Sequence, residues 1–468
     1  MRGMTLRAIA EACNGVYYGS EDNLDKEVTD ITTDSRKVQN GGLFVAICGE
    51  RTDGHKYIDG CFEAGALCVI SEKELEGQTN SYIKVKSSLQ ALKDMALLYR
   101  NNLDIKVVGI TGSVGKTSTK ETISYVLNKK YKVLKTEGNF NNEIGLPLTV
   151  FRLRDDDEVA VLEMGISDFG EMDRLSKIAQ PDISVITNIG LCHLENLKTR
   201  DGILKAKTEI FNNMKPDGIA ILNGDDDKLI TVDEVNGKKP ERFGINYKDG
   251  VYAKDIENLG LSGTKFVISG LNCVDGCKDF EVTVPVPGHH MIYNALAAAC
   301  VGAALELTST QIADGIADLK TISGRNNIIK TSKYTLIDDC YNANPVSMKA
   351  SVDVLDVAIG RKVCILGNMY ELGENEKNLH YDVGQYIGTK NIDVLITIGD
   401  LARHIAMGTD DYMETHFGSY DCEIHSFDDM EEFNMAYSSI LKDNDNILIK
   451  ASHAMKFADI VELLSKDN

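Results

Sequence analysis

The sequence predicts an α/β protein of three domains, with a doubly wound, mostly parallel sheet at its centre. Two observations predict this fold class. The chain has 468 residues, which is more than one hydrophobic core supports. Strand-like and helix-like runs alternate over two long stretches, and strands that alternate with helices form parallel sheets. The expected domains are residues 1–86, 87–321 and 322–468.

Residues 1–86 indicate a small N-terminal α/β domain. Apolar residues recur at helical spacing from Leu6 to Cys13, and Asn14-Gly15 closes that helix. Extended stretches follow around ITTDSR and GGLFVAICG, and a helix-like segment lies near residues 57–65. The first residues do not have the pattern of a signal peptide.

Residues 87–321 predict the central domain. A helix over residues 88–99 leads into the strands KVVGIT, KVLKT, VAVLEMG, DISVITNIG and GIAILN, with helices between them. Residues 251–286 indicate an antiparallel appendage. The apolar helix NALAAACVGAALEL follows it, and then a helix capped by Thr308 or Ser309.

Residues 322–468 repeat the alternation, from Ser323-Gly324-Arg325 onward. The strand-like runs are KYTLIDD, KVCILGN, DVLITIG and NILIKAS. They predict a C-terminal Rossmann-like α/β domain. Because this stretch has no Gly-x-Gly-x-x-Gly turn, we expect no nicotinamide cofactor.

Composition limits the possible classes of function. Residues are 43% hydrophobic and 26% charged, and no run approaches the roughly 18 apolar residues of a membrane span. The net charge of −21, with no basic cluster, argues against nucleic-acid binding. Eleven scattered cysteines indicate reduced thiols and a cytoplasmic protein. Cys273 and Cys277 lack the second pair that a zinc site needs.

The stretch GITGSVGKTS is typical of a phosphate-binding loop, or P-loop. It joins a strand-like run to a helix. Gly112 and Gly115 let backbone N–H groups approach phosphate oxygens, and the helix N-terminus adds its dipole. Lys116 can reach the β- and γ-phosphates, and the Thr117 hydroxyl can bind Mg²⁺. The strict pattern has glycine where this chain has Ile110, but the flanking elements are correct, so we predict ATP binding.

Three further residues suit such a site, each with a plainer alternative. Glu163 ends the run VAVLEMG, at the sheet edge where α/β proteins bind ligands, and a carboxylate there suits Mg²⁺. The alternative is a solvated glutamate. His193 follows another strand end, in TNIGLCHLE, where the alternative is a structural histidine. Lys207 lies on a helix whose apolar stripe runs from Ile203 to Phe211, so by pattern alone it is a surface lysine.

Other motifs point to functions that the rest of the chain does not support. Asp168-Phe169-Gly170 spells the metal-binding triplet of protein kinases, but no His-Arg-Asp loop or kinase lysine accompanies it. A GTPase would need an Asn-Lys-x-Asp sequence, and the chain has none. His289-His290 precedes a helix and could bind a metal, but a loop or cap role is the expected one.

Blocks along essentially the whole chain resemble those of the Mur ligase family. The blocks are TDSRKVQNGGLFVA, TDGHKYI, TGSVGKTS, GNFNNEIGLP, VLEMG, TNIGLCHLE, KAKTEIF, GHHMIYNALAA, SGRNN, DDCYNANPVSMKA, LGNMYELGE and IKASHAMK. Through DDCYNANP and LGNMYELG in particular, the chain resembles the branch that adds D-Ala-D-Ala to a UDP-N-acetylmuramoyl-tripeptide. The resemblance implies an ATP-dependent peptide ligase of cell-wall synthesis, acting as a monomer on these two small-molecule substrates.

The resemblance also implies roles for residues, position by position. Catalytic roles fall to Lys116, His193 and Lys207, and Lys207 would react with CO₂ to form a carbamate. Two Mg²⁺ ions would be held by Thr117, Glu163, His193 and carbamylated Lys207. ATP would be bound by Gly112, Ser113, Gly115, Lys116, Thr117, Ser118, Asn294, Arg325, Asp339 and Asn342, with Asn294 and Asn342 at the adenine end. The substrates would face Ser35, Arg36, Asn139, Asn141, Asn142, Lys450 and Ser452.

The implied chemistry makes sense of these residue types. In an ATP-driven amide ligation a carboxylate attacks the γ-phosphate, and Mg²⁺ with Lys116 neutralises the repulsion between the two anions. The amine of the acceptor then attacks the acyl phosphate. Carbamate formation needs a neutral amine, so the site would have to lower the pKa of Lys207 from its ordinary value of about 10.4.

The chain departs from the family pattern in three places. The usual Lys-Gly-Ser-Arg reads KASH at residues 450–453, the usual Asp of Gly-Asp-Met is Asn368, and the usual Phe-Gly-Ser reads LKT at residues 197–199. His453 in place of arginine removes a permanent charge that could bind a carboxylate. Two alternatives therefore stay open: a ligase of this type with another amino-acid or dipeptide acceptor, and a nucleotide-binding module that has lost catalysis.

Overall fold

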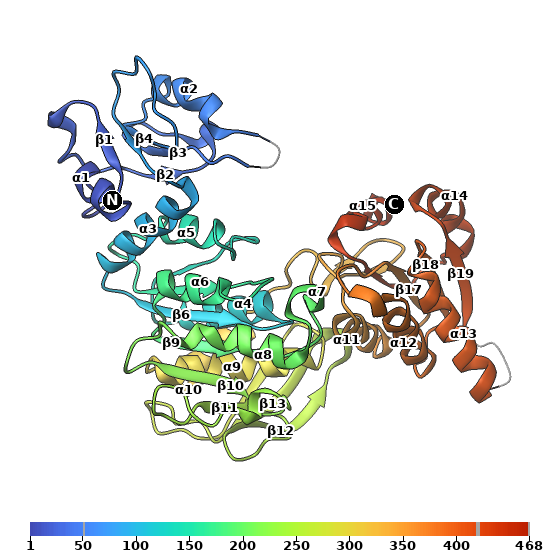
Figure 1. Ribbon diagram of the computed structural model, residues 1–468. Coiled ribbons are helices and arrows are strands. Elements are labelled where there is room, and N and C mark those ends of the chain that lie inside the picture. The colour runs from blue at the N-terminus through green and yellow to red at the C-terminus, as the bar shows by residue number, and fades with distance from the viewer. Residues whose placement is uncertain (50–51, 418–421, 467–468) are drawn as a thin grey trace.

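The computed structural model describes residues 1–49, 52–417 and 422–466. It contains three sheets of five, nine and six strands, which follow one another along the chain. The N-terminal part (blue) and the C-terminal part (red) are attached at different sides of the central part (Figure 1). The predicted three-domain, mostly parallel α/β architecture is confirmed.

The N-terminal sheet has the strand order β1-β5-β4-β3-β2, and β1 runs antiparallel to β5. Its elements are α1 (Leu6–Ala12), β1 (Val16–Tyr18), η1 (Glu21–Asn23), β2 (Ile31–Thr32), η2 (Ser35–Lys37), β3 (Leu43–Val45), η3 (Gly54–Tyr57), α2 (Ile58–Glu63), β4 (Cys68–Ser71) and β5 (Tyr82–Lys84). Of the stretch around ITTDSR expected to be extended, Ile31–Thr32 forms β2 and the last residues enter the 3₁₀ turn η2. The Asp34 side chain accepts the N–H of Arg36 and caps the 3₁₀ turn η2.

The central sheet has the strand order β14-β13-β12-β11-β10-β9-β6-β8-β7. Its elements are α3 (Ser88–Asn101), β6 (Lys106–Thr111), α4 (Lys116–Leu127), β7 (Val133–Lys135), α5 (Gly145–Val150), β8 (Val159–Glu163), α6 (Glu171–Ala179), β9 (Ile183–Ile186), α7 (Leu194–Leu197), α8 (Arg200–Thr208), η4 (Glu209–Phe211), β10 (Ile219–Asn223), η5 (Leu229–Thr231), β11 (Glu241–Gly244), β12 (Val251–Asn258), η6 (Gly260–Ser262), β13 (Thr264–Ser269), β14 (Phe280–Val284), α9 (His290–Ala304) and α10 (Ser309–Ala317). The strands from β7 to β12 are parallel, and β13 and β14 add the predicted antiparallel appendage at one edge.

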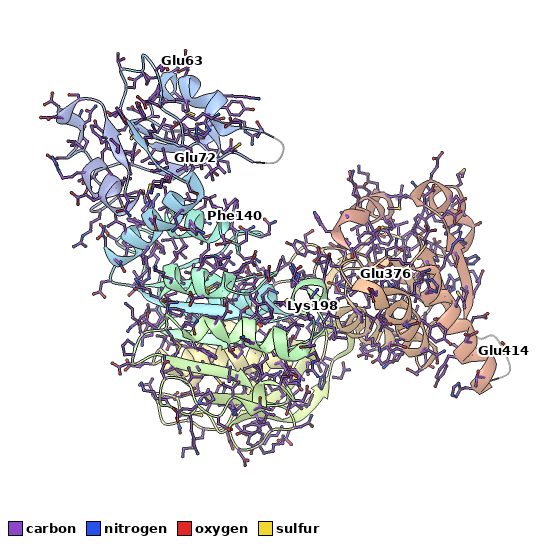
Figure 2. All side chains as sticks on the ribbon, in the orientation of Figure 1. Glu63, Glu72, Phe140, Lys198, Glu376 and Glu414 are labelled. Carbon is purple, nitrogen blue, oxygen red and sulfur yellow. The ribbon has the colours of Figure 1, made fainter. Side chains whose placement is uncertain are left out.

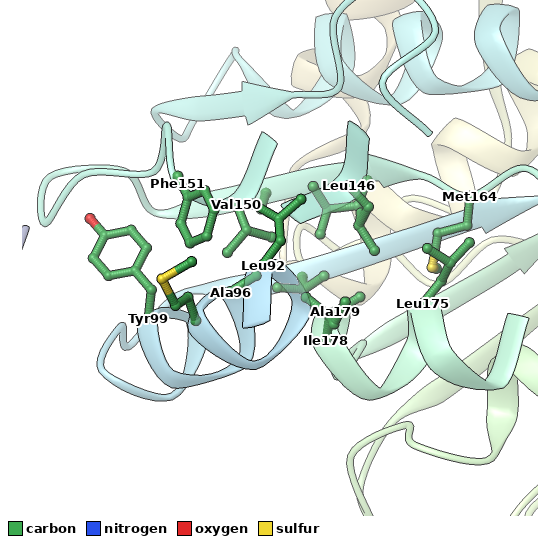
Figure 3. Packing of buried hydrophobic residues seen from close by; sticks show 14 of the residues in the cluster. Leu92, Ala96, Tyr99, Leu146, Val150, Phe151, Met164, Leu175, Ile178 and Ala179 are labelled. Atoms are coloured by element: carbon green, nitrogen blue, oxygen red, sulfur yellow. The ribbon is translucent and has the colours of Figure 1, made fainter. Parts of the chain in front are cut away.

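Helices cover both faces of the central sheet, as a doubly wound fold requires. On one face, Leu92 and Tyr99 of α3 pack beside Val150 and Phe151 of α5 and its C-terminal end, and beside Leu175 of α6 (Figure 3). On the other face lies a second apolar cluster, built from α4, the apolar helix α9 and α10. Because β6 sits between β8 and β9, the chain leaves it toward one side of the sheet and later returns to its other side. Ligands of open α/β sheets bind at the carboxyl end of such a switch point.

The C-terminal sheet has the strand order β15-β16-β20-β17-β18-β19, and β15 is antiparallel to β16. Its elements are β15 (Asn327–Lys330), β16 (Thr335–Asp338), α11 (Pro345–Asp356), β17 (Lys362–Gly367), η7 (Gly373–Asn375), α12 (Glu376–Gly388), β18 (Val394–Ile398), α13 (Arg403–Phe417), β19 (Glu423–Phe427), α14 (Met430–Ile440), β20 (Asn446–Lys450), η8 (His453–Met455) and α15 (Ala458–Lys466). Leu191 and Leu261 of the central part pack against this domain's core. Every helix in the described ranges is too short or too polar to cross a bilayer.

Candidate active site

A cavity of about 580 Å³ lies where the carboxyl ends of the central strands meet the C-terminal domain. Most of the predicted site residues line it. They are Ser113, Gly115, Lys116, Thr117, Ser118, Asn139, Asn141, Asn142, Glu163, His193, Asn294, Arg325, Asp339, Asn342 and Lys450. Five others are not among the lining residues of the described chain: Ser35, Arg36, Gly112, Lys207 and Ser452.

The P-loop spans from the end of β6 to the start of α4. Gly112 has a φ of +150°, and a Cβ there would lie 1.9 Å from the Thr187 hydroxyl oxygen, so only glycine fits. The Thr187 hydroxyl donates to the carbonyl of Val114, and the Asn188 side chain accepts the Val114 N–H. Sequence reasoning missed Thr187 and Asn188. Their signal was their place directly after strand β9, at the same sheet edge as the P-loop.

Lys116, the first residue of α4, turns back over this loop. Its Nζ donates to the carbonyl of Gly112 at 2.8 Å. Burial lowers the pKa of this ammonium group, and Glu163 opposes that change. The lysine is therefore held at the loop, within reach of the space that phosphates would occupy.

Lys207 is buried, so the surface position that periodicity predicts for it is wrong. Its exposed fraction is 1%, because α8 is covered by α6, α7 and η4. Burial, reinforced by the charge of Lys116, lowers the pKa of Lys207 to about 7. Burial and the two lysines lower the pKa of His193 to about 4, so its ring is neutral at pH 7. The His193 ring is therefore in the neutral form that can bind a metal, and part of the Lys207 population is a neutral amine at pH 7.

Glu163 is buried at the end of β8, with an exposed fraction of 2%, so the solvated alternative does not hold. Its Oε1 accepts the side-chain amide of Asn141 at 2.8 Å, while its Oε2 has no hydrogen-bond partner. The nearest cation to Oε2 is Lys120 Nζ, 3.8 Å away and hydrogen-bonded to the carbonyl of Thr136. A buried carboxylate oxygen without a partner is a fit for a hard cation.

The described side chains suit Mg²⁺ better than a metal that the protein alone encloses. No group of three or more His, Cys, Asp or Glu side chains comes together as a metal site in residues 1–49, 52–417 and 422–466. Mg²⁺ binds through one or two carboxylates together with substrate phosphates and waters. Glu163 beside a P-loop provides that arrangement.

The C-terminal domain supplies the opposite wall of the cavity. The guanidinium group of Arg325 lies over the ring of Tyr341, 4.2 Å from its centre. Lys450 Nζ donates to Asp339 Oδ2 at 2.6 Å and to the carbonyl of Asn342 at 2.9 Å. Tyr341 was not predicted, although it lies within the DDCYNANP block. The positive charge of Lys450 is therefore neutralised by Asp339 within the C-terminal domain.

Several predicted residues lie elsewhere or have partners that the sequence did not indicate. Arg36 is 86% exposed and forms a two-pronged ion pair with Asp34, whose pKa its hydrogen bond lowers to about 2. The Ser452 hydroxyl accepts the N–H of Tyr370. Asn294 lies beside the P-loop, where it accepts the hydroxyl of Thr119.

The His289-His290 pair lies at the N-terminal end of α9. His289 is the N-cap residue of α9, without a side-chain capping bond, and His290 begins the helix and lines the cavity. Burial lowers the pKa of His290. The expected loop or cap position is correct, but the contact of His290 with the cavity was not predicted.

Three family models match successive parts of the chain. They are described as Mur ligase family, catalytic domain (residues 27–100), Mur ligase middle domain (residues 110–302) and Mur ligase, glutamate ligase domain (residues 324–453). The chain belongs to the Mur ligase family, and it is a ligase.

The relatives point to one member of that family. The UDP-N-acetylmuramoyl-tripeptide–D-alanyl-D-alanine ligase of Bacillus subtilis is 36% identical over 98% of this chain and 97% of its own. The enzyme of that name from Escherichia coli is 32% identical over 100% and 99%. Among solved structures, MurF from Acinetobacter baumannii matches with a TM-score of 0.88 at 29% identity over 99% of both chains. MurF from Thermotoga maritima in complex with ADP matches with a TM-score of 0.81 at 31% identity over 94% and 97%.

Proposed function

We propose that this chain is an ATP-dependent peptide ligase that joins D-Ala-D-Ala to a UDP-N-acetylmuramoyl-tripeptide, giving the pentapeptide precursor of peptidoglycan. The observation that carries the proposal is a P-loop that shares one cavity with Glu163 and His193, with the buried Lys207 close enough for charge interactions with His193 and Lys116. A module that only bound nucleotide would not require all three. Full-length similarity to ligases of this name supports the choice of substrates.

The residues divide the work as follows. The P-loop amides and Lys116 bind the ATP phosphates, and Arg325 reaches them from the C-terminal domain. Thr117, Glu163, His193 and Lys207 would hold two Mg²⁺ ions, which supply positive charge against the phosphate oxygens. The substrate carboxylate attacks the γ-phosphate and ADP leaves. The acceptor amine then attacks the acyl carbon, phosphate leaves, and the amide remains.

Lys207 would serve as a carbamate. Its low pKa leaves a neutral amine available near pH 7. The amine nitrogen attacks CO₂ and loses one proton, which converts a buried cation into an anionic oxygen ligand. This also relieves the repulsion from Lys116 that the ammonium form meets.

We further propose that residues 1–86 hold the nucleotide-sugar end of the substrate, with Ser35 and Arg36 facing it. Residues 87–321 would bind ATP, and residues 322–468 would receive the acceptor. The protein would act in the cytoplasm as a monomer. All cysteines of the described chain are free thiols, which supports a reducing compartment.

The test is product formation with a panel of acceptors, scored by mass spectrometry. We expect a product with D-Ala-D-Ala, and phosphate release only when both substrates and ATP are present. Asn368 and His453 favour one second candidate, the same ligase with another acceptor, so D-Ala-D-lactate, D-Ala-D-Ser and single amino acids belong in the panel. Phosphate release that needs neither substrate would contradict the ligase proposal.

A further inference from the structure

A loop of the C-terminal domain brings a carboxylate to the catalytic cluster of the central domain. Glu371 Oε2 lies 3.6 Å from His193 Nδ1. Figure 2 labels Lys198 at the end of α7 and Glu376 at the start of α12, on the two sides of this junction. The Glu371 side chain is 72% exposed, and it makes no hydrogen bond to any other residue that the structure describes. It therefore reaches the site and remains open to a ligand.

The loop that carries Glu371 is fixed just before it. The N–H of Met369 donates to the ring Nε2 of the buried His380 at 2.8 Å. The N–H of Tyr370 donates to the Ser452 hydroxyl at 2.9 Å. Glu371 itself has a φ of +63°, which is uncommon for a residue other than glycine. An exposed carboxylate on a tightly held backbone is arranged in advance for binding.

The other carboxylates at the junction already have roles. Glu163 accepts the amide of Asn141, and its second oxygen, which has no hydrogen-bond partner, is the proposed metal ligand. Asp339 is paired with Lys450. An acceptor that arrives as an ammonium ion would be repelled by Lys116, so it needs a carboxylate that no cation already neutralises.

We propose that Glu371 binds the α-ammonium group of the dipeptide acceptor and holds its nitrogen beside the acyl phosphate. The contact would be a charge-assisted N⁺–H···O⁻ hydrogen bond. The inference rests on the proposed function and adds to it a residue that recognises the acceptor. The role is one of binding and positioning, with no covalent step.

The experiment separates the two halves of the reaction. Wild type, Glu371→Gln and the control Glu374→Gln are assayed for the KM of D-Ala-D-Ala. The acyl phosphate formed without acceptor is trapped with hydroxylamine. Because a charged hydrogen bond is lost, Glu371→Gln should raise the acceptor KM by roughly 10- to 100-fold. Trapped hydroxamate should stay at the wild-type level, since that step precedes acceptor binding. Glu374→Gln, which removes an equal charge three residues away, should change neither value.

Each other outcome has a defined meaning. An acceptor KM within twofold of wild type would overturn the role of Glu371. So would a loss of hydroxamate that matches the loss of ligation, because Glu371 would then act on the phosphate or the metal. N-acetyl-D-Ala-D-Ala cannot carry the ammonium group, so wild type and Glu371→Gln should bind it equally, and a difference would also contradict the proposal. Absence of hydroxamate with wild type would contradict the proposed ligase function instead.

Discussion

Two lysines are buried near the site, and their surroundings differ: Lys450 lines the cavity from the C-terminal domain, whereas Lys207 is buried in α8 of the central domain. Lys450, on the C-terminal wall, donates to Asp339 and to the carbonyl of Asn342. Lys207, on the central side, has no hydrogen bond or ion pair from its ammonium group to another residue in the described ranges, and its pKa is lowered to about 7. Lys450 holds its charge because Asp339 neutralises it, and this pair supports the structure around it. Lys207 has no such partner, so burial lowers its pKa and makes a neutral, reactive amine accessible.

The largest expected effect comes from removing the unpaired lysine. Lys207→Ala and Lys207→Arg should each lower the ligation rate by about 10³-fold or more, because neither can form the carbamate. Millimolar acetate should partly restore Lys207→Ala by filling the vacated space, and should not restore Lys207→Arg, whose charge still occupies it. Initial rates measured with and without acetate test this. If Lys207→Arg kept most of the wild-type ligation rate, a positive charge at this position would be sufficient and the carbamate proposal would be wrong.

Removing Lys450, the lysine paired with Asp339, should lower the stability of the fold. Lys450→Met leaves the Asp339 carboxylate buried without its cation, which should lower the free energy of unfolding by about 3 kcal/mol. The double variant Lys450→Met/Asp339→Asn removes the stranded charge and should recover part of the loss. Urea denaturation followed by circular dichroism gives both values. Equal losses in the single and double variants would mean that the ion pair is not the cause.

The two lysines should also differ in their effect on the pH dependence of stability. Between about pH 8 and pH 9, Lys207 is mostly neutral in the folded protein and protonated in the unfolded chain, because its folded pKa is about 7. The unfolded state then binds more protons, so stability rises with pH, by up to about 1.4 kcal/mol per pH unit. Below pH 7 the lysine is protonated in both states, so the slope disappears and the full cost of burying the charge remains. In CO₂-free buffer, the slope of wild type should exceed that of Lys207→Met, and parallel curves would contradict the low pKa.

The smallest expected effect concerns Glu163, the buried carboxylate at the end of β8. Asn141→Ala removes the amide that orients Glu163, so the Mg²⁺ concentration for half-maximal rate should rise about tenfold. Asn142→Ala is the matched control, since the Asn142 side chain accepts the N–H groups of Ile144 and Gly145 at the start of α5. It should lower stability by about 1 kcal/mol and leave the Mg²⁺ requirement unchanged. The same shift in both variants would assign the effect to the loop as a whole.

The P-loop, Glu163 and His193 could be predicted as one site because each lies at or after the end of a strand. Parallel strands end at one sheet edge, so the P-loop, Glu163 and His193 had to lie close together once the alternation of strands and helices was recognised. Burial of Lys207 could not be predicted in this way. Helical periodicity predicts only one buried face of a helix. Because α6 and α7 also pack against α8, a residue outside its apolar stripe is buried as well.

The C-terminal half was harder to predict because its residues act through long-range pairs. Nothing in the sequence near Ser452 indicates that its hydroxyl accepts the N–H of Tyr370, 82 residues earlier. Glu371 lies in a block that the resemblance identified, yet its approach to His193 depends on how two domains meet. Such contacts leave no periodic signal in the chain.

The cavity draws its walls from two separate hydrophobic cores, one behind the P-loop and one behind Arg325 and Asp339. A nucleotide bound in this cavity would therefore contact residues that rest on both cores. Its binding energy is lost when either core melts, so occupancy makes the melting of each depend on the other. In calorimetry, adding nucleotide should bring the unfolding temperatures of the central and C-terminal domains closer together. The ligand would thereby make the unfolding of the two domains cooperative.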